Sequence, residues 1–295
     1  MTAAALGAAG FAIGVMLCRI GSGRTPPSAE FARLPEFSVW CVVTGFEVAL
    51  WVLCGLSARG VERDIKARLP PAPLWPFVVV LIALVVAVRI GLLLYPLIRM
   101  PLYAMQVRQS ILQALGLLAA FPALLGTWRI QAWLRSMSAL TRPGQTPRRP
   151  GKVMSDLLFV REALRRLMVL FSLMIGAVVF ATGALRSAYL AVGHPHADFP
   201  AVSVLLFGGL FTAMLALLFV PVYVDQRAFR RHMRDSLSRF PRDGRPAEDW
   251  YAQRERLTGL LQLNSGALEA VQVTTAVLGP LLGALVTLFV PDLKI

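Results

Sequence analysis

The most constraining feature of this sequence is a series of long apolar segments. There are seven of them, and the shortest has 16 residues: Ala3 to Cys18, Ser38 to Leu56, Pro73 to Ile98, Gln109 to Trp128, Leu167 to Leu185, Pro200 to Val224 and Ala270 to Val290. A helix needs about 20 mostly apolar residues to cross the hydrocarbon core of a bilayer, which is roughly 30 Å thick. The sequence therefore predicts an all-α, polytopic transmembrane helical bundle of about seven spans.

The composition supports this class and excludes others. Of the 295 residues, 57% are hydrophobic and 16% are charged, so a soluble globule would lack the polar surface to cover them. A disordered chain is poor in apolar residues, and this chain is rich in them. Arginine greatly outnumbers lysine, 27 against 3, which we interpret as the codon usage of a GC-rich bacterium.

The distribution of basic residues predicts the orientation, because connections rich in Lys and Arg stay on the cytoplasmic side. The second, fourth and sixth connections hold four, nine and nine such residues, whereas the first, third and fifth hold three, two and one. We therefore expect a multi-pass protein of the plasma (cytoplasmic) membrane with its N-terminus inside and its C-terminus outside. The three arginines of the first connection point the other way, and the first segment is short enough to be interfacial instead of spanning.

Two of the basic connections predict cytoplasmic helical hairpins. In the connection of residues 129–166, Trp133 and Met137 continue the helical spacing of the preceding span. Residues 142–151 are rich in Pro and Gly and are expected to form the turn. Ser155 is a candidate N-cap for the returning helix, which leads into the next span.

The second predicted hairpin occupies residues 225–269. Phe229, Met233 and Leu237 are spaced four residues apart and are flanked by arginines, a pattern typical of an amphipathic helix. These assignments divide the chain into a membrane region 1–128, a hairpin 129–166, two transmembrane helices 167–224, a hairpin 225–269, and a last transmembrane helix with a short external tail 270–295.

The arginines of these hairpins predict a basic cytoplasmic face. Its members are Arg148, Arg149, Arg161, Arg165, Arg227, Arg230, Arg231 and Arg234. A basic residue close to an anionic leaflet contributes about 1 kcal/mol to membrane binding, so we expect anionic lipid headgroups as the partner. The aromatic residues of the hairpins form no stacking series of the kind that binds nucleic acid, so no nucleic acid is expected.

Glu47 and Arg89 are charged residues within predicted spans. They lie near mid-depth of the second and third segments, which are neighbouring antiparallel helices. A charge at this depth costs about 2.5 to 3.5 kcal/mol on insertion scales, so the two are predicted to form an ion pair. Such a pair either lines an ion or proton path or locks two helices together, and both interpretations stay open.

The last span carries a polar face and a close-packing motif. Glu269, Gln272, Thr274 and Thr275 gather on one side of its start. This helix either lines a pore or hydrogen-bonds to its neighbours. Gly279 and Gly283 follow, with the GxxxG spacing of close helix packing, and Gly10 and Gly14 in the first segment are expected to be packing sites as well.

The remaining chemistry-bearing residues give weaker signals. His194, His196 and Asp198 have a spacing that can bind a metal, but a solvated external loop is the favoured interpretation. Cys18, Cys41 and Cys54 show no paired motif, so we expect free thiols, with a Cys18 to Cys41 bond as the alternative. No motif of a membrane enzyme is present in the sequence, so neither a cofactor nor catalysis is expected.

Two functions fit these observations. The first is a passive channel or small-solute transport or permeabilising component, gated by the basic hairpins and expected to be a homo-oligomer or part of a membrane complex. The alternative is a non-catalytic membrane subunit or scaffold that docks a partner. The spans have few polar residues, which disfavours an ion-coupled transporter. A channel closed by an apolar constriction tolerates such spans.

Overall fold

The computed structural model describes residues 2–79, 81–82, 85–86, 104–140, 150–193, 199–238, 248–261, 278–279 and 285. In this part of the chain all regular structure is helical. The helices are α1 (Ala3–Arg19), α2 (Pro26–Ala32), α3 (Pro35–Arg68), α5 (Met105–Leu140), α6 (Pro150–Ala191), α7 (Ala201–Leu237) and α8 (Glu248–Leu260). Shorter helical pieces lie between residues 75 and 86. The predicted all-α class is confirmed.

Four of the described helices, α3, α5, α6 and α7, are long and apolar enough to cross a membrane. They contain the second, fourth, fifth and sixth predicted segments and make the chain compatible with an integral membrane protein. The first segment forms α1, which is apolar and has 17 residues. Most of the third and seventh segments lie outside the described residues, so the count of seven spans stays a prediction.

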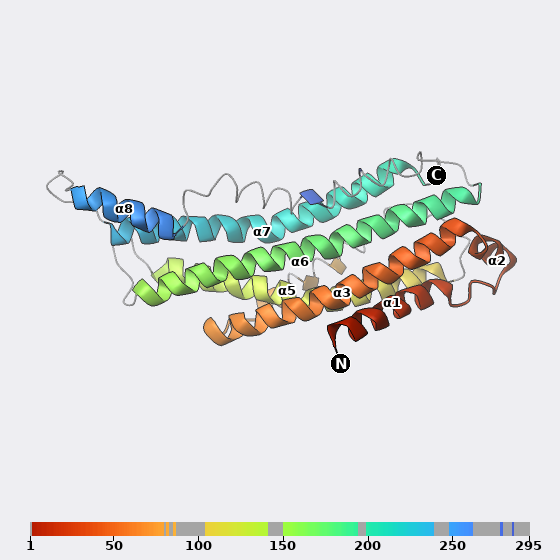
Figure 1. The fold of residues 1–295 in the computed structure, drawn as a ribbon, viewed down its shortest axis with the longest axis horizontal. Coiled ribbons are helices and arrows are strands. Elements are labelled where there is room, and N and C mark those ends of the chain that lie inside the picture. Colours follow the sequence, from red (N-terminus) through yellow and green to blue (C-terminus); the bar gives the residue numbers. More distant parts are fainter. Residues whose placement is uncertain are drawn as a thin grey trace.

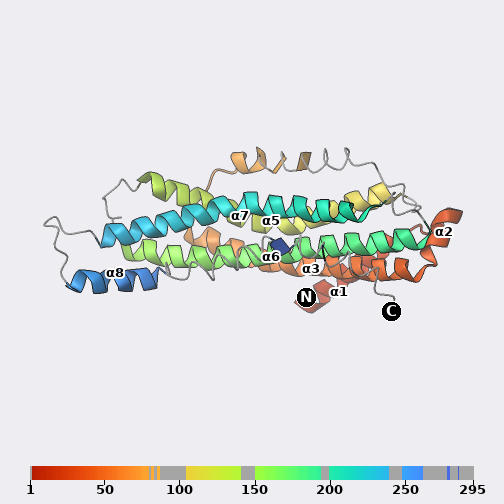
Figure 2. The same cartoon turned by 90° about the horizontal axis from the view of Figure 1, so that it is seen from above.

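The four long helices run side by side (Figure 1), and the view turned by 90° shows the same arrangement (Figure 2). α3 contacts α1, α5 and α6, while α7 contacts α5, α6 and α8. Helices of 34 to 42 residues are about 50 to 60 Å long at a rise of about 1.5 Å per residue. They exceed the roughly 30 Å of hydrocarbon and therefore extend well beyond it.

The described parts of the three most basic connections lie together at one end of the bundle, which we call the inner end. The last residues of α3, α5 and α7 and the first residues of α6 gather there with α8, while α2 and the start of α3 lie at the opposite, outer end (Figure 1). The alternation of basic and less basic connections predicts this grouping. The compartment that the inner end faces stays a prediction.

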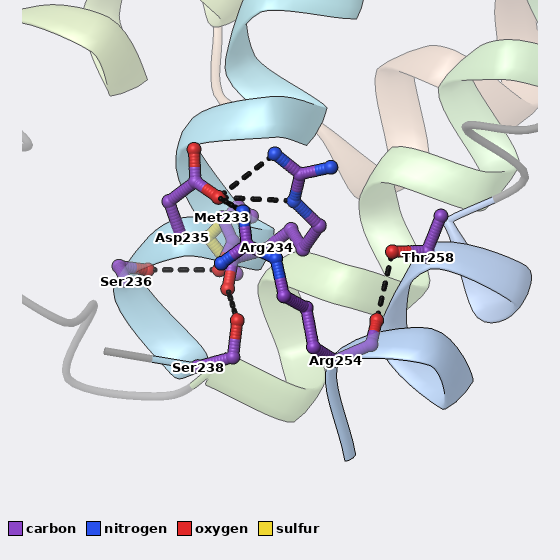
Figure 3. Close-up of polar contacts among 7 residues, drawn as sticks. All are labelled: Met233, Arg234, Asp235, Ser236, Ser238, Arg254 and Thr258. Atoms are coloured by element: carbon purple, nitrogen blue, oxygen red, sulfur yellow. Dashed lines mark hydrogen bonds and ion pairs between the residues drawn. The ribbon is translucent and has the colours of Figure 1, made fainter. Parts of the chain in front are cut away.

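Ion pairs connect the helices at the inner end. Glu62 of α3 pairs with Arg129 of α5. Asp235 near the end of α7 accepts hydrogen bonds from Arg234 Nε and from Arg254 Nη2 of α8, both at 2.9 Å (Figure 3). These contacts hold α3 on α5 and α8 on α7. The described helices occupy the positions predicted for the hairpins, but the turns 142–147 and 241–246 lie outside the described residues.

The predicted start of the returning helix at Ser155 is wrong. Helix α6 already begins at Pro150. Proline suits the first position of a helix, because its fixed φ is helical and the amide it lacks would have no partner there. Pro35 begins α3 in the same way. Helix α6 therefore begins within the Pro- and Gly-rich stretch 142–151, five residues before Ser155.

Close backbone approach fixes α1 against α3. A Cβ atom on Gly14 would lie 2.6 Å from the carbonyl oxygen of Thr44 and 2.8 Å from Cα of Gly45, and one on Gly10 would lie 3.1 Å from Cα of Ala49. Glycine is needed at both positions for the helices to come this close. The prediction that Gly10 and Gly14 are packing sites is confirmed.

Candidate functional site

A cleft of about 980 Å³ lies between α3, α5, α6 and α7. On α5 its lining begins at Met105 and ends at Arg135, a length of about 45 Å at a rise of about 1.5 Å per residue. It therefore covers the whole predicted span from Gln109 to Trp128 and exceeds the roughly 30 Å thickness of the hydrocarbon core. The described part of the cleft reaches from the outer to the inner half of the bundle.

One face of α3 supplies the most distinctive wall of the cleft. Trp40, Thr44, Glu47 and Trp51 all line it and all are buried. Their spacing of four, three and four residues places them along a single helical stripe. The stripe carries one carboxyl and one hydroxyl group between two indole rings. Glu47 was predicted as a notable residue, whereas its three neighbours on the stripe were not, although helical spacing alone links them.

The facing walls are largely apolar. α6 contributes Phe171, Met174 and Val178, and α7 contributes Phe207 and Phe211, whose rings make an edge contact with centroids 4.8 Å apart. An apolar lining with a few polar groups is typical of sites that take small organic ligands, and such sites commonly measure about 300 to 1,000 Å³.

Polar side chains gather toward the two ends of the cleft. Gln109, Ser110 and Gln113 line it in the outer half of α5, and Gln131 and Arg135 line it in the inner half. Gly116 faces Trp51, so Gln113, one turn earlier on α5, lies at about the depth of Glu47. Thr182, whose hydroxyl donates to the carbonyl of Val178 at 2.9 Å, also belongs to this outer part. The lining of α5 between Gly116 and Trp128 is largely apolar. The cleft thus has a polar outer part that holds Glu47, a largely apolar middle and a polar inner mouth.

Glu47 is the central polar residue of this site. Only 6% of its surface is exposed, and it borders both the main cleft and a smaller cavity of about 230 Å³ between α3 and α6. Its carboxyl group makes no hydrogen bond or ion pair with any residue that the structure describes. Burying an uncompensated carboxyl group is costly.

Packing around Trp51 sets the position of Glu47 one turn away. The indole Nε1 of Trp51 donates to the carbonyl of Met174 on α6 at 3.2 Å. On α5, a Cβ atom on Gly116 would lie 3.2 Å from the same ring, so glycine leaves the room that the indole fills. α3, α5 and α6 therefore meet at Trp51, which holds the cleft-lining face of α3 toward the interior of the bundle.

Several predicted site residues lie outside the described part of the chain. They are Arg89, Arg148, Arg149, His194, His196, Asp198, Glu269, Gln272, Thr274 and Thr275. The Glu47 to Arg89 pair and the polar face of the last span therefore stay predictions. Gly279 is described, and a Cβ atom on it would lie 3.7 Å from Oγ of Ser172, so this part of the last segment lies against α6. Among the described residues, no group of three potential metal ligands comes together.

The arginines predicted to form a basic face differ in their exposure. Arg165 and Arg231 are exposed, while Arg161, Arg227 and Arg234 are partly buried. Arg165 and Arg166 both pair with Glu162 on the same helix, at 3.1 Å and 2.8 Å. One carboxylate of α6 is therefore shared by two of its arginines.

Arg230 does not lie on an exposed face. Only 1% of its surface is exposed, and its Nη1 donates to the carbonyl of Leu261 just beyond α8 at 3.3 Å. It lies beside Phe229 and one turn from Met233, on the buried side of α7. Its long side chain crosses the apolar contact and reaches the end of α8, where a cation is favoured by the helix dipole.

Two buried arginines lie at the outer end. In the sequence they are recognisable only as positive charges in the connections between spans. Arg108, of which 6% is exposed, donates from Nη1 to the carbonyl of Cys18 at 2.6 Å and from Nη2 to that of Ile20. Arg186 donates from Nε to the carbonyl of Phe199 at 3.0 Å. Arg108 thereby stabilises carbonyls at the C-terminal end of α1, a role that basic residues commonly play, whereas Arg186 binds a carbonyl just before the start of α7. The carbonyls come from distant sequence positions, so no local pattern indicates the pairing.

The cysteines follow the favoured prediction. Cys18, Cys41 and Cys54 are free thiols and all are buried. Cys18 and Cys41 belong to the cluster of buried residues at the outer end, together with Phe31 and Phe37. In this structure the thiols contribute apolar packing to the contact between α1 and α3.

The lining of the cleft offers one carboxyl group, a few hydroxyl and amide groups and a largely apolar surface. Acid–base catalysis generally needs a second titratable group within hydrogen-bond reach of the first, and the described lining places none beside Glu47. No family model matches the chain, and no curated protein or solved structure matches it either.

Proposed function

We propose that the protein is a passive channel or small-solute transport component and that the cleft is its path. The observation that carries this proposal is the extent of the cleft, whose lining on α5 runs from Met105 to Arg135. A buried pocket serving only structural packing has no reason to be longer than the bilayer is thick. Polar mouths at both ends and an apolar centre are the features of a path that admits water at its ends and restricts passage in between.

The apolar centre acts as the barrier in this proposal. Leu124 and Phe171 belong to this part of the lining, and apolar constrictions close pores by excluding water. Glu47 lies on the outer side of this barrier, and its carboxyl group favours solutes that carry a positive charge. The path is therefore expected to be selective for cations over anions.

The inner end supplies the gate. Arg135 lines the inner mouth of the cleft, and the pair of Glu62 with Arg129 lies one and a half turns before it on α5. A partner or lipid that competes for these arginines would change how α3 and α5 lie at the mouth. By the positive-inside rule this end faces the cytoplasm, where anionic headgroups are the expected ligands of the exposed Arg165 and Arg231.

The path is tested by narrowing it. Ala114 lines the cleft, whereas Leu118 on the same helix does not and is 72% exposed. We expect Ala114→Trp to reduce cation flux into proteoliposomes at least tenfold, because an indole fills the path, and Leu118→Trp to leave the flux unchanged, because its side chain faces lipid. Flux is measured with a potassium-sensitive dye trapped in the vesicles.

The flux assay also separates the path from the alternative role as a scaffold. Equal flux through both tryptophan variants would contradict the proposed path. Vesicles without flux, combined with a protein that co-purifies in stoichiometric amount and is lost when the arginines at the inner end are replaced, would instead favour a subunit that docks a partner.

A further inference from the structure

We propose that Glu47, with the aromatic residues beside it, forms a binding site for a lipophilic organic cation within the cleft. This inference rests on the proposed function, because it places a ligand of a stated class within the proposed path. It goes further in assigning one binding site at a defined depth in the cleft. The site consists of the Glu47 carboxyl group, the Thr44 hydroxyl group and the rings of Trp40 and Trp51.

The electrostatics of the cleft favour a cation at Glu47. Apart from Glu47, Arg135 is the charged residue in the described lining. Glu62, which pairs with Arg129, lies fifteen residues beyond Glu47 on α3, or about 22 Å at the helical rise, and Arg135 lies farther still toward the inner end. No described residue forms an ion pair with the carboxyl group, so a positively charged ligand is the complement that this surface lacks.

The shape and chemistry of the walls favour an organic cation. Trp40 lies two turns before Glu47 and Trp51 one turn after it, on the same face of α3. Phe207 and Phe211 form part of the opposite wall. The face of an aromatic ring attracts a cation by about 0.5 to 2 kcal/mol. The apolar groups of an organic cation also gain free energy when they are buried against these walls. A cleft of about 980 Å³ has room for a ligand of this size.

A small inorganic cation fits this site less well. Hard cations are typically surrounded by about six or more oxygen ligands. Near Glu47 the described lining supplies the hydroxyl groups of Thr44 and Thr182 and the side-chain amide oxygen of Gln113. The oxygen atoms available are too few to replace a hydration shell. An organic cation needs no such shell, because its charge is spread and its surface is apolar.

The predicted ion pair with Arg89 is the competing arrangement. If Arg89 neutralised Glu47, the cleft would lose its preference for positive charge. Two ions of nearly equal size and shape distinguish these cases, since tetraphenylphosphonium is a cation and tetraphenylborate an anion. Their comparison in the unmodified protein needs no variant and therefore does not depend on whether a substitution at Glu47 folds.

The experiment measures binding of both ions by equilibrium dialysis to the full chain in nanodiscs of zwitterionic lipid, with empty nanodiscs as the reference. We expect saturable binding of tetraphenylphosphonium and no binding of tetraphenylborate above the reference. Glu47→Gln should weaken the affinity for the phosphonium at least tenfold. Glu36→Gln removes the same charge from the outer end of α3, away from the lining, and should leave the affinity unchanged.

Two results would overturn the proposal: equal binding of the two ions, or an unchanged affinity in a folded Glu47→Gln variant. The flux assay tests the proposed path separately from this binding site. Flux that Ala114→Trp abolishes, without preference for the phosphonium, would leave the path and remove this site. Preference for the phosphonium with no flux of any solute would leave the site and remove the path.

Discussion

Replacing Gly14 by alanine is expected to lower the thermal midpoint of the detergent-solubilised protein by several degrees. The new Cβ atom would lie 2.6 Å from the Thr44 carbonyl oxygen and 2.8 Å from Cα of Gly45. These are backbone atoms and no rotamer change relieves the contact, so α1 must move away from α3. Overpacking of this kind costs about 1 to 3 kcal/mol, which outweighs the gain of about 1 kcal/mol that alanine brings to a helix.

Gly60 provides the matched control. It is exposed on α3, and no described atom lies within 4 Å of the position that its Cβ atom would take. Gly60→Ala should therefore raise the midpoint slightly or leave it unchanged, because only the helix propensity changes. A lower midpoint for Gly14→Ala, together with an unchanged or higher midpoint for Gly60→Ala, identifies the α1–α3 contact as tight packing. If the midpoint fell equally in both variants, that result would contradict a close backbone contact between α1 and α3 at Gly14.

Arg108→Met is expected to release the end of α1. The guanidinium group donates to the carbonyls of Cys18 and Ile20, and a hydrogen bond from a charged donor contributes about 1.5 to 3 kcal/mol. Methionine fills a similar volume but donates nothing. We expect the amides of residues 16–20 to exchange hydrogen at least tenfold faster in the variant, measured by mass spectrometry of peptides from this segment.

The control for Arg108 is Arg165→Met. Arg165 is largely exposed and pairs with Glu162 on its own helix, and surface pairs of this kind contribute about 0 to 1 kcal/mol. Its replacement should leave exchange in residues 16–20 unchanged. If Arg108→Met also left exchange unchanged, the arginine would not hold the end of α1 against the start of α5.

Much of the fold follows from local sequence properties. The apolar segments beginning at Ser38, Gln109, Leu167 and Pro200 are predicted by hydropathy, because a membrane span is a property of one continuous stretch. The helix of residues 225–237 is predicted by its apolar stripe, and Phe229 and Met233 are indeed buried. The start of α6 was misplaced, because proline ends a helix when it lies inside one and begins a helix when it lies at the first position.

The candidate site could be predicted only in part. Glu47 is recognisable in the sequence, because an acidic residue in the middle of an apolar span is costly. The cleft around it is not, because it depends on which faces of α5, α6 and α7 turn toward α3. Arg108 illustrates the same limit. Its charge is visible in the sequence, but its partners at Cys18 and Ile20 become its neighbours only when α1 and α5 pack at the outer end.

The central claim is that water reaches the cleft within the membrane. Gln113 lines the cleft, and Leu118 faces outward on the same helix. Thiols react with charged methanethiosulfonates as thiolates, which form in water and not in lipid. In proteoliposomes, the Gln113→Cys variant should be labelled rapidly and the Leu118→Cys variant no faster than the unmodified chain, whose three thiols are buried. If both variants were labelled at the same rate, whether fast or slow, that result would contradict a water-accessible path.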